Sequence, residues 1–411
     1  MDTFIQKLKI IIGEKSIRDR VLFVLLALVV FRALAAVPIP GVDATVLEQF
    51  FNNNQFLGLM NIFSGGGLTN LSIIMLGVGP FITASIIMQL MTIMSPKIKA
   101  MYSEEGETGR ARFTQYSRLL TLPLAVLQAF GFLSLLRSQG VITGLSTEEF
   151  ILNVIIVVAG SILLLWLGEL VTEYGIGNGV SIIIFAGIVA TLPMSISQFL
   201  FGFDASQIPL LVGFAIAALA IIYGVVVMTQ AERQVPITHA KQVRGGQTYG
   251  GTTSYLPLRL NQAGVIPIIF ALSILLFPQM LLNILLSFNV GFALSWQEHI
   301  TAFLNNQVLY AAVYFVLVFV FTFFYTAVTF DPDAMSKNLQ RTGAFILGKL
   351  ITRLTFTGAL FLGVIAVLPM IMQILTKVQT LAIGGTALLI AVSVVIDMVR
   401  RVDSQVSLRQ Y

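Results

Sequence analysis

The chain has 411 residues, of which 57% are hydrophobic and only 10% are charged, and its mean hydropathy is +0.91. Soluble domains carry about 25% charged residues, so this composition excludes a soluble globule of the same size. Cysteine is absent, which excludes a disulfide framework, a thiolate metal site and a thiol nucleophile. The net charge is +5, and the positions of the charges are more informative than their sum.

The first 20 residues carry five of the cations, and an apolar run follows at 21–37. Within this leader the apolar residues fall on one helical face and the lysines elsewhere, which predicts a cytoplasmic helix over 1–20 lying in the membrane interface. The long cationic leader and the many later apolar segments favour a retained first span over a cleaved signal peptide.

A membrane-spanning helix needs about 20 apolar residues, and ten segments meet this requirement: 21–37, 70–94, 118–136, 150–170, 180–201, 208–230, 262–287, 308–330, 351–374 and 381–399. With the N-terminus in the cytoplasm, 21 of the 24 Lys and Arg residues lie in cytoplasmic segments, as the positive-inside rule requires. The sequence therefore predicts an all-α polytopic membrane protein with ten transmembrane helices and with both termini in the cytoplasm.

An internal repeat divides these spans. Span 2 reads Gly77-Val78-Gly79-Pro80-Phe81-Ile82, and span 7 reads Gly264-Val265-Ile266-Pro267-Ile268-Ile269. A weaker match links Ile176-Gly177-Asn178-Gly179 before span 5 with Ile383-Gly384-Gly385-Thr386 in span 10. A duplicated unit of five spans inserts with inverted topology, and inverted halves place a pathway at their interface.

We therefore expect two inverted five-helix halves around a central pore. The N-terminal half covers 21–201 with spans 1–5, and the C-terminal half covers 202–399 with spans 6–10. The C-terminal half contains cytoplasmic loops at 231–261 and 331–350, and a cytoplasmic tail follows at 400–411.

Catalytic motifs are missing from the sequence. It has no HExxH, no Gly-x-Ser-x-Gly and no P-loop, and its two histidines, His239 and His299, fall in predicted loops. We therefore expect no enzymatic activity, no cofactor and no metal site. No span has a central Asp, Glu, Lys or His, which counts against proton- or sodium-coupled transport. A passive conduit, a scaffold and a channel driven by another protein stay open.

The loop at 231–261 is basic and rich in glycine. It is long for a simple connection, and loops of this length are often functional. It is either a solvated connector or a surface that docks an acidic protein or RNA phosphates.

Several long strings of the sequence resemble the SecY family of protein-conducting channels over roughly residues 18–400. The strings are NIFSGGGL (61–68), LGVGPFITASIIMQLM (76–91), EGETGRARFTQYSR (105–118), WLGELVTEYGIGNGVSIIIFAGIVATLP (166–193), YGGTTSYLPLRLNQAGVIPIIFA (249–271) and FFYTAVTFDPDAMSKNLQRTGAFI (323–346).

The resemblance implies an hourglass pore that is closed midway by a ring of aliphatic side chains. A collar of branched aliphatic residues is poorly wetted and therefore holds back ions. Matched motif by motif, the implied ring consists of Val78, Ile82, Val180, Ile184, Ile269 and Ile390. From periodicity alone, these six residues are also consistent with ordinary packing between spans.

The resemblance also implies a plug at about 54–68. A short half-helix can fill the outer funnel of an idle channel, and glycine makes its end flexible. The implied plug residues are Asn54, Phe56, Leu57, Leu59, Met60, Ile62, Phe63, Ser64, Gly65, Gly66 and Gly67. The residues alone allow a second reading, in which 38–69 is an ordinary re-entrant or surface loop.

A lateral gate is implied between spans 2 and 3 on one side and spans 7 and 8 on the other. Its polar residues would be Thr83, Gln89, Gln128 and Asn261, and hydrogen bonds between helices in lipid are individually weak. The cytoplasmic loops would dock the ribosome or the motor ATPase SecA through Arg233, Lys241, Arg244, Arg259, Lys337 and Arg341.

The chain departs from the family pattern after span 8. Members continue past Gly-Ala-Phe-Ile into a Pro- and Arg-containing stretch, whereas here Phe345 and Ile346 run almost directly into span 9. This shortening puts motor docking through that loop in doubt.

The resemblance implies the pore-forming subunit of a general secretion channel in a bacterial inner membrane. Its implied partners are the small subunits SecE and SecG, SecA, the ribosome, precursors that carry a signal sequence, and membrane lipid. The alternatives are a secondary transporter built on inverted repeats and a scaffold or insertase without a through-pore.

Overall fold

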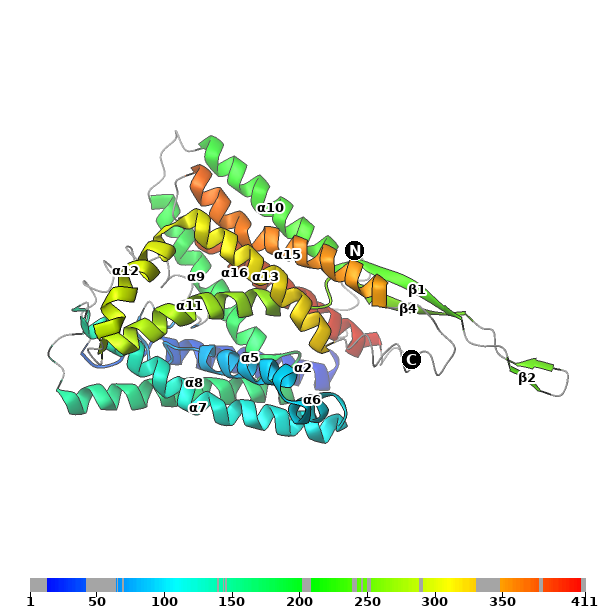
Figure 1. Ribbon diagram of the computed structural model, residues 1–411, viewed down its shortest axis with the longest axis horizontal. Helices are drawn as coiled ribbons and strands as arrows, with labels where there is room; N and C mark the ends of the chain where they lie inside the picture. Colours follow the sequence, from blue (N-terminus) through cyan, green and yellow to red (C-terminus); the bar gives the residue numbers. More distant parts are fainter. Residues whose placement is uncertain are drawn as a thin grey trace. The chain divides into compact units, whose positions relative to one another are not determined.

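The computed structural model (Figure 1) describes residues 13–41, 64, 66–68, 70–138, 140–142, 144, 146–201, 208–238, 242–244, 247–249, 253–287, 291–329, 348–376 and 380–407. Its helices are α2 (Lys15–Ala35), α5 (Gly79–Met94), α6 (Pro96–Ser103), α7 (Gly106–Ser138), α8 (Thr147–Tyr174), α9 (Gly179–Phe201), α10 (Ile208–Gln230), α11 (Ile266–Ser287), α12 (Gly291–Asn305), α13 (Gln307–Thr329), α15 (Gly348–Thr376) and α16 (Thr380–Ser407). Each of the ten predicted spans overlaps one of these helices, which confirms a helical polytopic fold.

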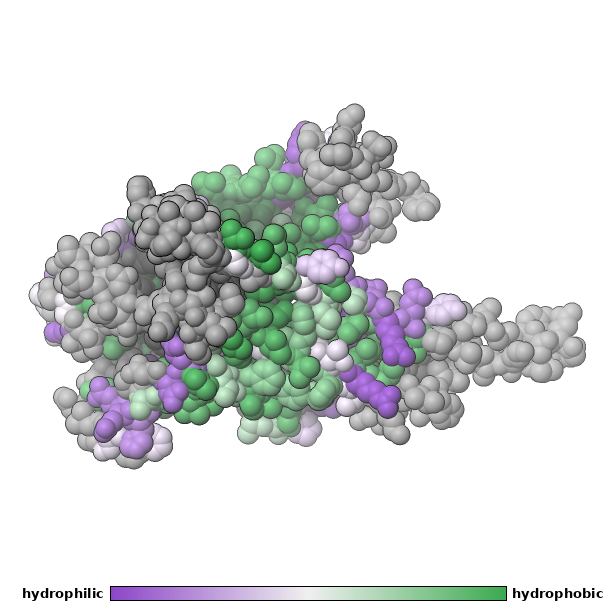
Figure 2. Space-filling view, turned by 90° about the horizontal axis from the view of Figure 1, so that it is seen from above, coloured by the Kyte–Doolittle hydropathy of each residue, from purple (hydrophilic) through white to green (hydrophobic). Residues whose placement is uncertain are grey.

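Four described helices are individually long and apolar enough to cross a membrane, over Gly106–Arg137, Thr147–Tyr174, Gln307–Val328 and Leu350–Leu368. The α5–α6 pair is a fifth if the two helices are counted as one bent span. The exposed surface of these helices is also apolar, since large side chains such as Leu119, Ile155, Val316 and Val320 are about half exposed or more. Figure 2 shows such hydrophobic side chains covering much of the described surface.

Span 2 differs from its predicted extent. The helix begins at Gly79 and not at residue 70, because residues 70–78 form a series of turns, most of them buried. The backbone φ is +40° at Leu71 and +58° at Gly77, and these left-handed conformations interrupt an α-helix. At its other end α5 meets α6 at an angle of 112°. Ser95 is extended there, as expected for a residue that precedes a proline.

The chain forms two compact units, and the first comprises Met1–Ala205, Leu276–Ala302 and Val394–Tyr411. In it α5 packs on α7, α7 on α8, and α8 on α9 and α2, and Figure 1 shows α5, α7 and α8 side by side. A buried core joins α7, α8 and the turns before α5, with Leu68, Leu71 and Val157 completely enclosed. At its start α8 has a capping box between Ser146 and Glu149, which satisfies two free backbone N–H groups.

The second unit comprises Ser206–Leu275 and Phe303–Ser393. Its main contact is between α13 and α15, where Phe319 lies edge-on to Phe356 with ring centroids 5.7 Å apart. Phe270 on α11 makes edge-to-face contacts with Phe321 and Tyr325 on α13. Aromatic pairs of this geometry add to the stability from burial. The predicted five-helix halves stay a prediction, because α11 and α16 are each divided between the two units.

The loop at 231–261 contains a β-ribbon that the sequence reading did not anticipate. Strand β1 (Glu232–Thr238) pairs antiparallel with β4 (Thr253–Arg259), and β2 (Gln242–Arg244) pairs with β3 (Gln247–Tyr249). Leu258 is buried against Ile351 and Leu354 of α15, so the base of the ribbon is fixed to a helix. Beyond that contact the ribbon projects, with β2 near its tip (Figure 1).

The register of this ribbon places a proline in each strand. Leu260 N–H donates to Ala231 O at its base, so the amides of alternate residues, including position 236 on β1 and position 257 on β4, point away from the partner strand. Both of these positions are prolines, Pro236 and Pro257. Each strand therefore lacks one outward N–H donor in its middle.

Candidate functional site

The sequence repeat corresponds to a repeated local structure at the start of α5 and α11. Gly77 and Gly264 both have a positive φ, of +58° and +64°. In each copy a valine follows the glycine, and its carbonyl accepts a backbone hydrogen bond from an isoleucine four residues later. Ile82 N–H donates to Val78 O over 3.0 Å, and Ile269 N–H donates to Val265 O over 3.4 Å. A proline occupies the first turn in both, where its missing N–H has no cost.

The weaker repeat has no such shared geometry. Gly177 lies in the turn between α8 and α9 with a φ of +96°, whereas residues 383–386 already lie inside α16, which begins at Thr380. The two glycine-rich strings therefore differ in local structure, and their correspondence stays a match of sequence alone.

The predicted ring residues sit mostly at the beginnings of helices. Val78 is the N-cap of α5 and Ile82 is in its first turns, Val180 and Ile184 are in the first turns of α9, and Ile269 is near the start of α11. Val78, Ile184 and Ile390 are buried, and the other three are half-buried.

Of the predicted plug, the residues from Asn54 to Phe63 and Gly65 lie outside the described residues. Ser64, Gly66, Gly67 and Leu68 are buried. Ser64 Oγ accepts a hydrogen bond from Leu68 N–H over 3.0 Å, and Gly67 O accepts one from Ser72 N–H over 2.8 Å. This end of the predicted plug is thus a packed, hydrogen-bonded turn.

The two ends of the chain segment that contains the predicted plug are paired with each other. Ile39 N–H donates to Leu71 O over 2.9 Å, and Ile73 N–H donates to Val37 O over 3.0 Å. We name residues 37–41 together with 64–73 the plug base. It lies in the core of the first unit, since Ile39, Leu68 and Leu71 are all buried there.

Two residues that the sequence reading missed hold this base from α8. Asn153 Nδ2 donates to Pro40 O over 3.2 Å, and the Asn153 side chain is buried. At Gly160 an added Cβ would lie only 2.0 Å from Ile73 O. A side-chain amide and a glycine inside an apolar span are typical of close contacts between helices in a membrane. Their presence in span 4 was the sequence signal that could have identified these two residues.

The predicted gate residues differ in how their polar groups are satisfied. Thr83 on α5 and Gln128 on α7 are hydrogen-bonded to each other, so within the first unit the structure brings these two together. Asn261 bonds locally, because its Oδ1 accepts from Gly264 N–H over 3.0 Å. Gln89 is half-buried, and its Oε1 has no hydrogen-bond partner among the described residues.

The predicted docking residues fall on the ribbon and on the following loop. Arg233 and Arg259 are exposed, and Arg259 Nε lies 3.3 Å from Glu232 Oε1. Arg244 is in β2, whereas Lys241, Lys337 and Arg341 lie outside the described residues. The shortened loop after span 8, where the sequence departs from the family pattern, also lies outside the described residues.

Two ion pairs involve charged residues of the long apolar helices. Glu169 on α8 forms an ion pair with Arg118 on α7, and Arg401 Nε lies 2.9 Å from Asp397 Oδ2 on α16. In the part of the chain that the structure describes, no group of three or more His, Asp or Glu side chains could hold a metal ion.

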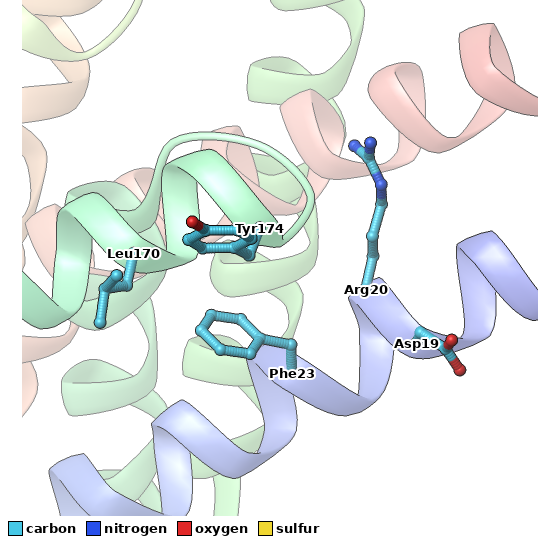
Figure 3. A pocket seen from close by; sticks show the side chains of 5 residues that line it. All are labelled: Asp19, Arg20, Phe23, Leu170 and Tyr174. Carbon is cyan, nitrogen blue, oxygen red and sulfur yellow. The ribbon is translucent and has the colours of Figure 1, made fainter.

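A shallow groove lies between α2 and α8, lined by Asp19, Arg20, Phe23, Leu170 and Tyr174 (Figure 3). The rings of Phe23 and Tyr174 are 5.8 Å apart and tilted. None of these five residues belongs to the predicted ring, plug, gate or docking sets, so the groove is separate from the candidate site.

Comparison with known proteins identifies the family of this chain and shows its fold. The SecY family model matches residues 72–399. Protein translocase subunit SecY of Mycobacterium leprae is 37% identical over 443 aligned positions that cover 100% of this chain and 99% of that protein. The SecY subunit of Pseudomonas aeruginosa is 40% identical and covers 97% of this chain and 93% of its own length.

Two solved structures share the fold. One, described as "The structure of a protein conducting channel", has a TM-score of 0.64 at 19% identity and covers 94% of this chain and 92% of that chain. A second, on the plug domain of the SecY protein, has a TM-score of 0.63 at 20% identity with the same coverage.

The M. leprae alignment has 443 positions and this chain only 411 residues, so that relative contains residues without a counterpart here. The family resemblance in the sequence is nevertheless confirmed along nearly the whole chain. Because the family model matches most of its residues and relatives exceed 30% identity over almost its full length, this chain belongs to the SecY family of protein translocase subunits.

Proposed function

We propose that this chain is the pore-forming subunit of a general secretion channel. It would pass unfolded polypeptides across the membrane and release hydrophobic segments sideways into lipid. The observation that carries the proposal is the pair of equivalent helix starts, in which Ile82 and Ile269 occupy the same place after a left-handed glycine. The names of the relatives agree with this function and do not favour the transporter.

The aliphatic ring is assigned to Val78, Ile82, Val180, Ile184, Ile269 and Ile390. Four of the six are fixed by the first turns of a helix, where backbone hydrogen bonds and packing leave the side chain little freedom. A rigid apolar collar excludes ions because it offers them no ligand to replace their water. The collar also has no polar group of its own to satisfy, so it can close around almost any peptide.

The plug is assigned to residues 54–68, of which the last five also belong to the plug base. The lateral gate is assigned to the α5–α7 and α11–α13 pairs. Two features support these assignments. Both ends of the plug segment are held together by backbone hydrogen bonds. Each helix pair of the gate has its own internal contact, namely Gln128 with Thr83 and Phe270 with Phe321.

The proposed location is the bacterial cytoplasmic membrane, with both termini in the cytoplasm. The support is the placement of 21 of 24 Lys and Arg residues on one side of the ten spans. The same orientation puts the β-ribbon in the cytoplasm, where it would contact the ribosome or SecA. One solved neighbour is described as Sec61 in a canine ribosome-channel complex, which supports a ribosomal partner.

SecE and SecG are proposed as the small membrane subunits, and SecA as the source of energy. The chain itself has no nucleotide-binding motif, so a partner must supply the work of translocation. We propose no catalytic activity, cofactor or metal for this chain.

Reconstitution tests the proposal. Proteoliposomes with this chain, SecE, SecG, SecA and ATP should protect a signal-bearing precursor from added protease. The same precursor without its signal sequence is the control and should stay accessible. If no precursor becomes protected, even in a variant whose loop after span 8 is lengthened to the family pattern, the channel assignment is wrong.

A further inference from the structure

Helix α12 connects two spans with almost no chain to spare. The helix of predicted span 7, α11, ends at Ser287, and α12 begins at Gly291 after positions 288–290. At its other end only Asn306 separates α12 from α13, which is long and apolar enough to cross a membrane. Three residues reach at most about 11 Å, so both ends of α12 stay close to the ends of these two helices.

The junction with α13 is a closed, hydrogen-bonded turn. Asn306 N–H donates to Phe303 O over 3.3 Å, and Tyr310 N–H donates to Asn306 O over 2.9 Å. Asn306 Oδ1 also accepts from Leu309 N–H over 3.1 Å, which satisfies a free donor in the first turn of α13. The rings of Phe303 and Tyr310 lie 6.1 Å apart. Whatever holds α12 therefore also holds this end of α13.

Helix α12 is amphipathic and too short to cross a membrane. It has 15 residues, whereas a spanning helix needs about 20. At a spacing of 3.6 residues per turn, its apolar side chains gather on one side. We name this side the apolar face of α12, and it contains Ala293, Trp296, Ile300, Phe303 and Leu304. The opposite side contains Ser295, Glu298 and Ala302, and all three are exposed.

The described chain covers this apolar face only in part. Ala293 is completely buried and Ile300 is half-buried, but Trp296, its largest side chain, is 52% exposed. A tryptophan combines a large apolar ring with an N–H donor, so it is stabilised where acyl chains meet lipid headgroups. The sequence of α12 contains no Lys or Arg, so its attraction to lipid would come from apolar area and not from headgroup charge.

We propose that α12 is an interfacial helix, with Trp296 and Ile300 in contact with membrane lipid and Glu298 in water. Lipid is favoured over a protein partner because both ends of α12 continue into membrane helices, so the face stays at the membrane surface. Such helices typically bury their apolar side about 5–10 Å into the boundary between headgroups and acyl chains. The inference goes beyond the proposed channel function and holds for either side of the membrane.

Spin labelling tests this placement. The chain has no cysteine, so each introduced cysteine is a unique labelling site in complexes of the full chain whose partner subunits carry neither cysteine nor tryptophan. The complexes are placed in vesicles of phosphatidylethanolamine and phosphatidylglycerol. Accessibility of each label is measured to oxygen, which concentrates in hydrocarbon, and to a water-soluble nickel chelate. The two labels on the apolar face are Trp296→Cys and Ile300→Cys, and the matched controls are Glu298→Cys and Ala302→Cys.

The ratio of oxygen to nickel accessibility should be about fivefold higher at the two apolar positions than at the two controls. If nickel reaches all four labels equally, α12 lies in water and the inference is wrong. If the labels at 296 and 300 are shielded from both reagents, protein covers the apolar face, and the inference is equally wrong.

A second measurement leaves α12 unchanged. The chain has two tryptophans, so Trp166→Phe leaves Trp296 as the sole fluorophore of this type. A lipid with a nitroxide at its headgroup should quench Trp296 about twofold more than a lipid with a nitroxide at the end of its acyl chain. The control is Trp296→Phe, which retains the exposed Trp166 of the α8 span. Quenching of Trp166 without quenching of Trp296 would overturn the inference, and neither measurement depends on translocation of a precursor.

Discussion

The side-chain amide of Gln128 on α7 donates a hydrogen bond to Thr83 Oγ1 on α5 over 3.3 Å. Thr83 Oγ1 itself donates to Gly79 O one turn earlier, over 3.0 Å. The two polar groups are thus satisfied within a single helix pair. In the described state they join α5 to α7, which lie on the same side of the proposed gate.

The first prediction concerns this bond. Gln128→Leu, Thr83→Val and the double variant should show a coupling energy of about 0.5–1 kcal/mol, the usual size of a hydrogen bond between membrane helices. The measurement is the free energy of unfolding of the purified complex in detergent. Strictly additive losses would mean that the two side chains do not interact in the molecule.

Gln89 leads to a different expectation. Its Oε1 is buried without a hydrogen-bond partner in the described part of the chain, so Gln89→Leu removes an unsatisfied group and should raise stability slightly. If Gln89 instead pairs across the gate once a signal enters, Gln89→Leu slows translocation of signal-bearing precursors. Comparing the rate with that of Gln128→Leu distinguishes a gate contact from a contact within one helix pair.

The aliphatic ring is tested by polar substitution. Ile82→Asn and Ile390→Asn should each increase ion leak and allow precursors with defective signals to be translocated, because an amide lets water wet the collar. The control is Ile87→Asn, which places the same amide at another half-buried position of α5. Unchanged leak and unchanged selectivity in both ring variants would contradict the assignment.

The crossing of α8 and α9 depends on a glycine. An added Cβ at Gly179 would lie 1.9 Å from Gly168 O, so Gly179→Ala should lower the free energy of unfolding by about 1–3 kcal/mol through overpacking. Gly213 on α10 has open space around it. Gly213→Ala should therefore be neutral or stabilising by up to about 1 kcal/mol, as alanine is the better helix former. Thermal unfolding of both variants checks the contrast.

The attachment of the β-ribbon depends on Leu258. Burial of Leu258 against Ile351 and Leu354 fixes the ribbon to α15. Leu258→Ala should lower the free energy of unfolding of this attachment by about 2–5 kcal/mol. Hydrogen exchange in β1 and β4 should become faster while exchange in α13 stays the same. Tyr255→Ala, at a residue that is 63% exposed on the same ribbon, should change neither. Equal protection of the ribbon in both variants would contradict the role of Leu258.

Docking through the ribbon should depend on charge and on salt. Arg233 is exposed, and Arg233→Glu should weaken co-sedimentation of proteoliposomes with ribosomes and reduce its salt dependence. Arg259 already has an exposed partner in Glu232, so Arg259→Ala should have the smaller effect on both binding and stability. The opposite ranking of the two arginines would argue against this docking surface.

The sequence was sufficient for one helix in each of the ten predicted spans and for the G-V-x-P repeat, because both depend on local signals, whereas α6 and α12 were not predicted. Apolar length located the spans, and the G-V-x-P pattern specifies a left-handed glycine and a proline in a first turn, which recur in α5 and α11. The same reasoning misplaced the start of span 2. Leu71 and Met75 are as apolar as a span requires, but they pack into turns that pair with Val37 and Ile39.

The missed features depend on contacts between distant residues or on short patterns. Asn153 and Pro40 are 113 residues apart, and nothing in the surroundings of either one identifies the other. The ribbon was missed because glycine and charge are frequent in the loop, although β1 and β4 each contain β-branched or aromatic residues as well as a proline. The bend at Pro96 followed a known rule, but its angle is set by how α6 packs on α7.

The prolines at 236 and 257 have a consequence for what can bind to the edges of the ribbon. A two-stranded ribbon has two open edges, and an open edge normally recruits a passing extended chain. A translocation channel is surrounded by extended chains, namely its own substrates. With the middle outward donor removed from both strands, an unfolded precursor cannot add itself as a continuous third strand. The edges of the ribbon are therefore protected from strand addition, and its exposed side chains stay available to a binding partner.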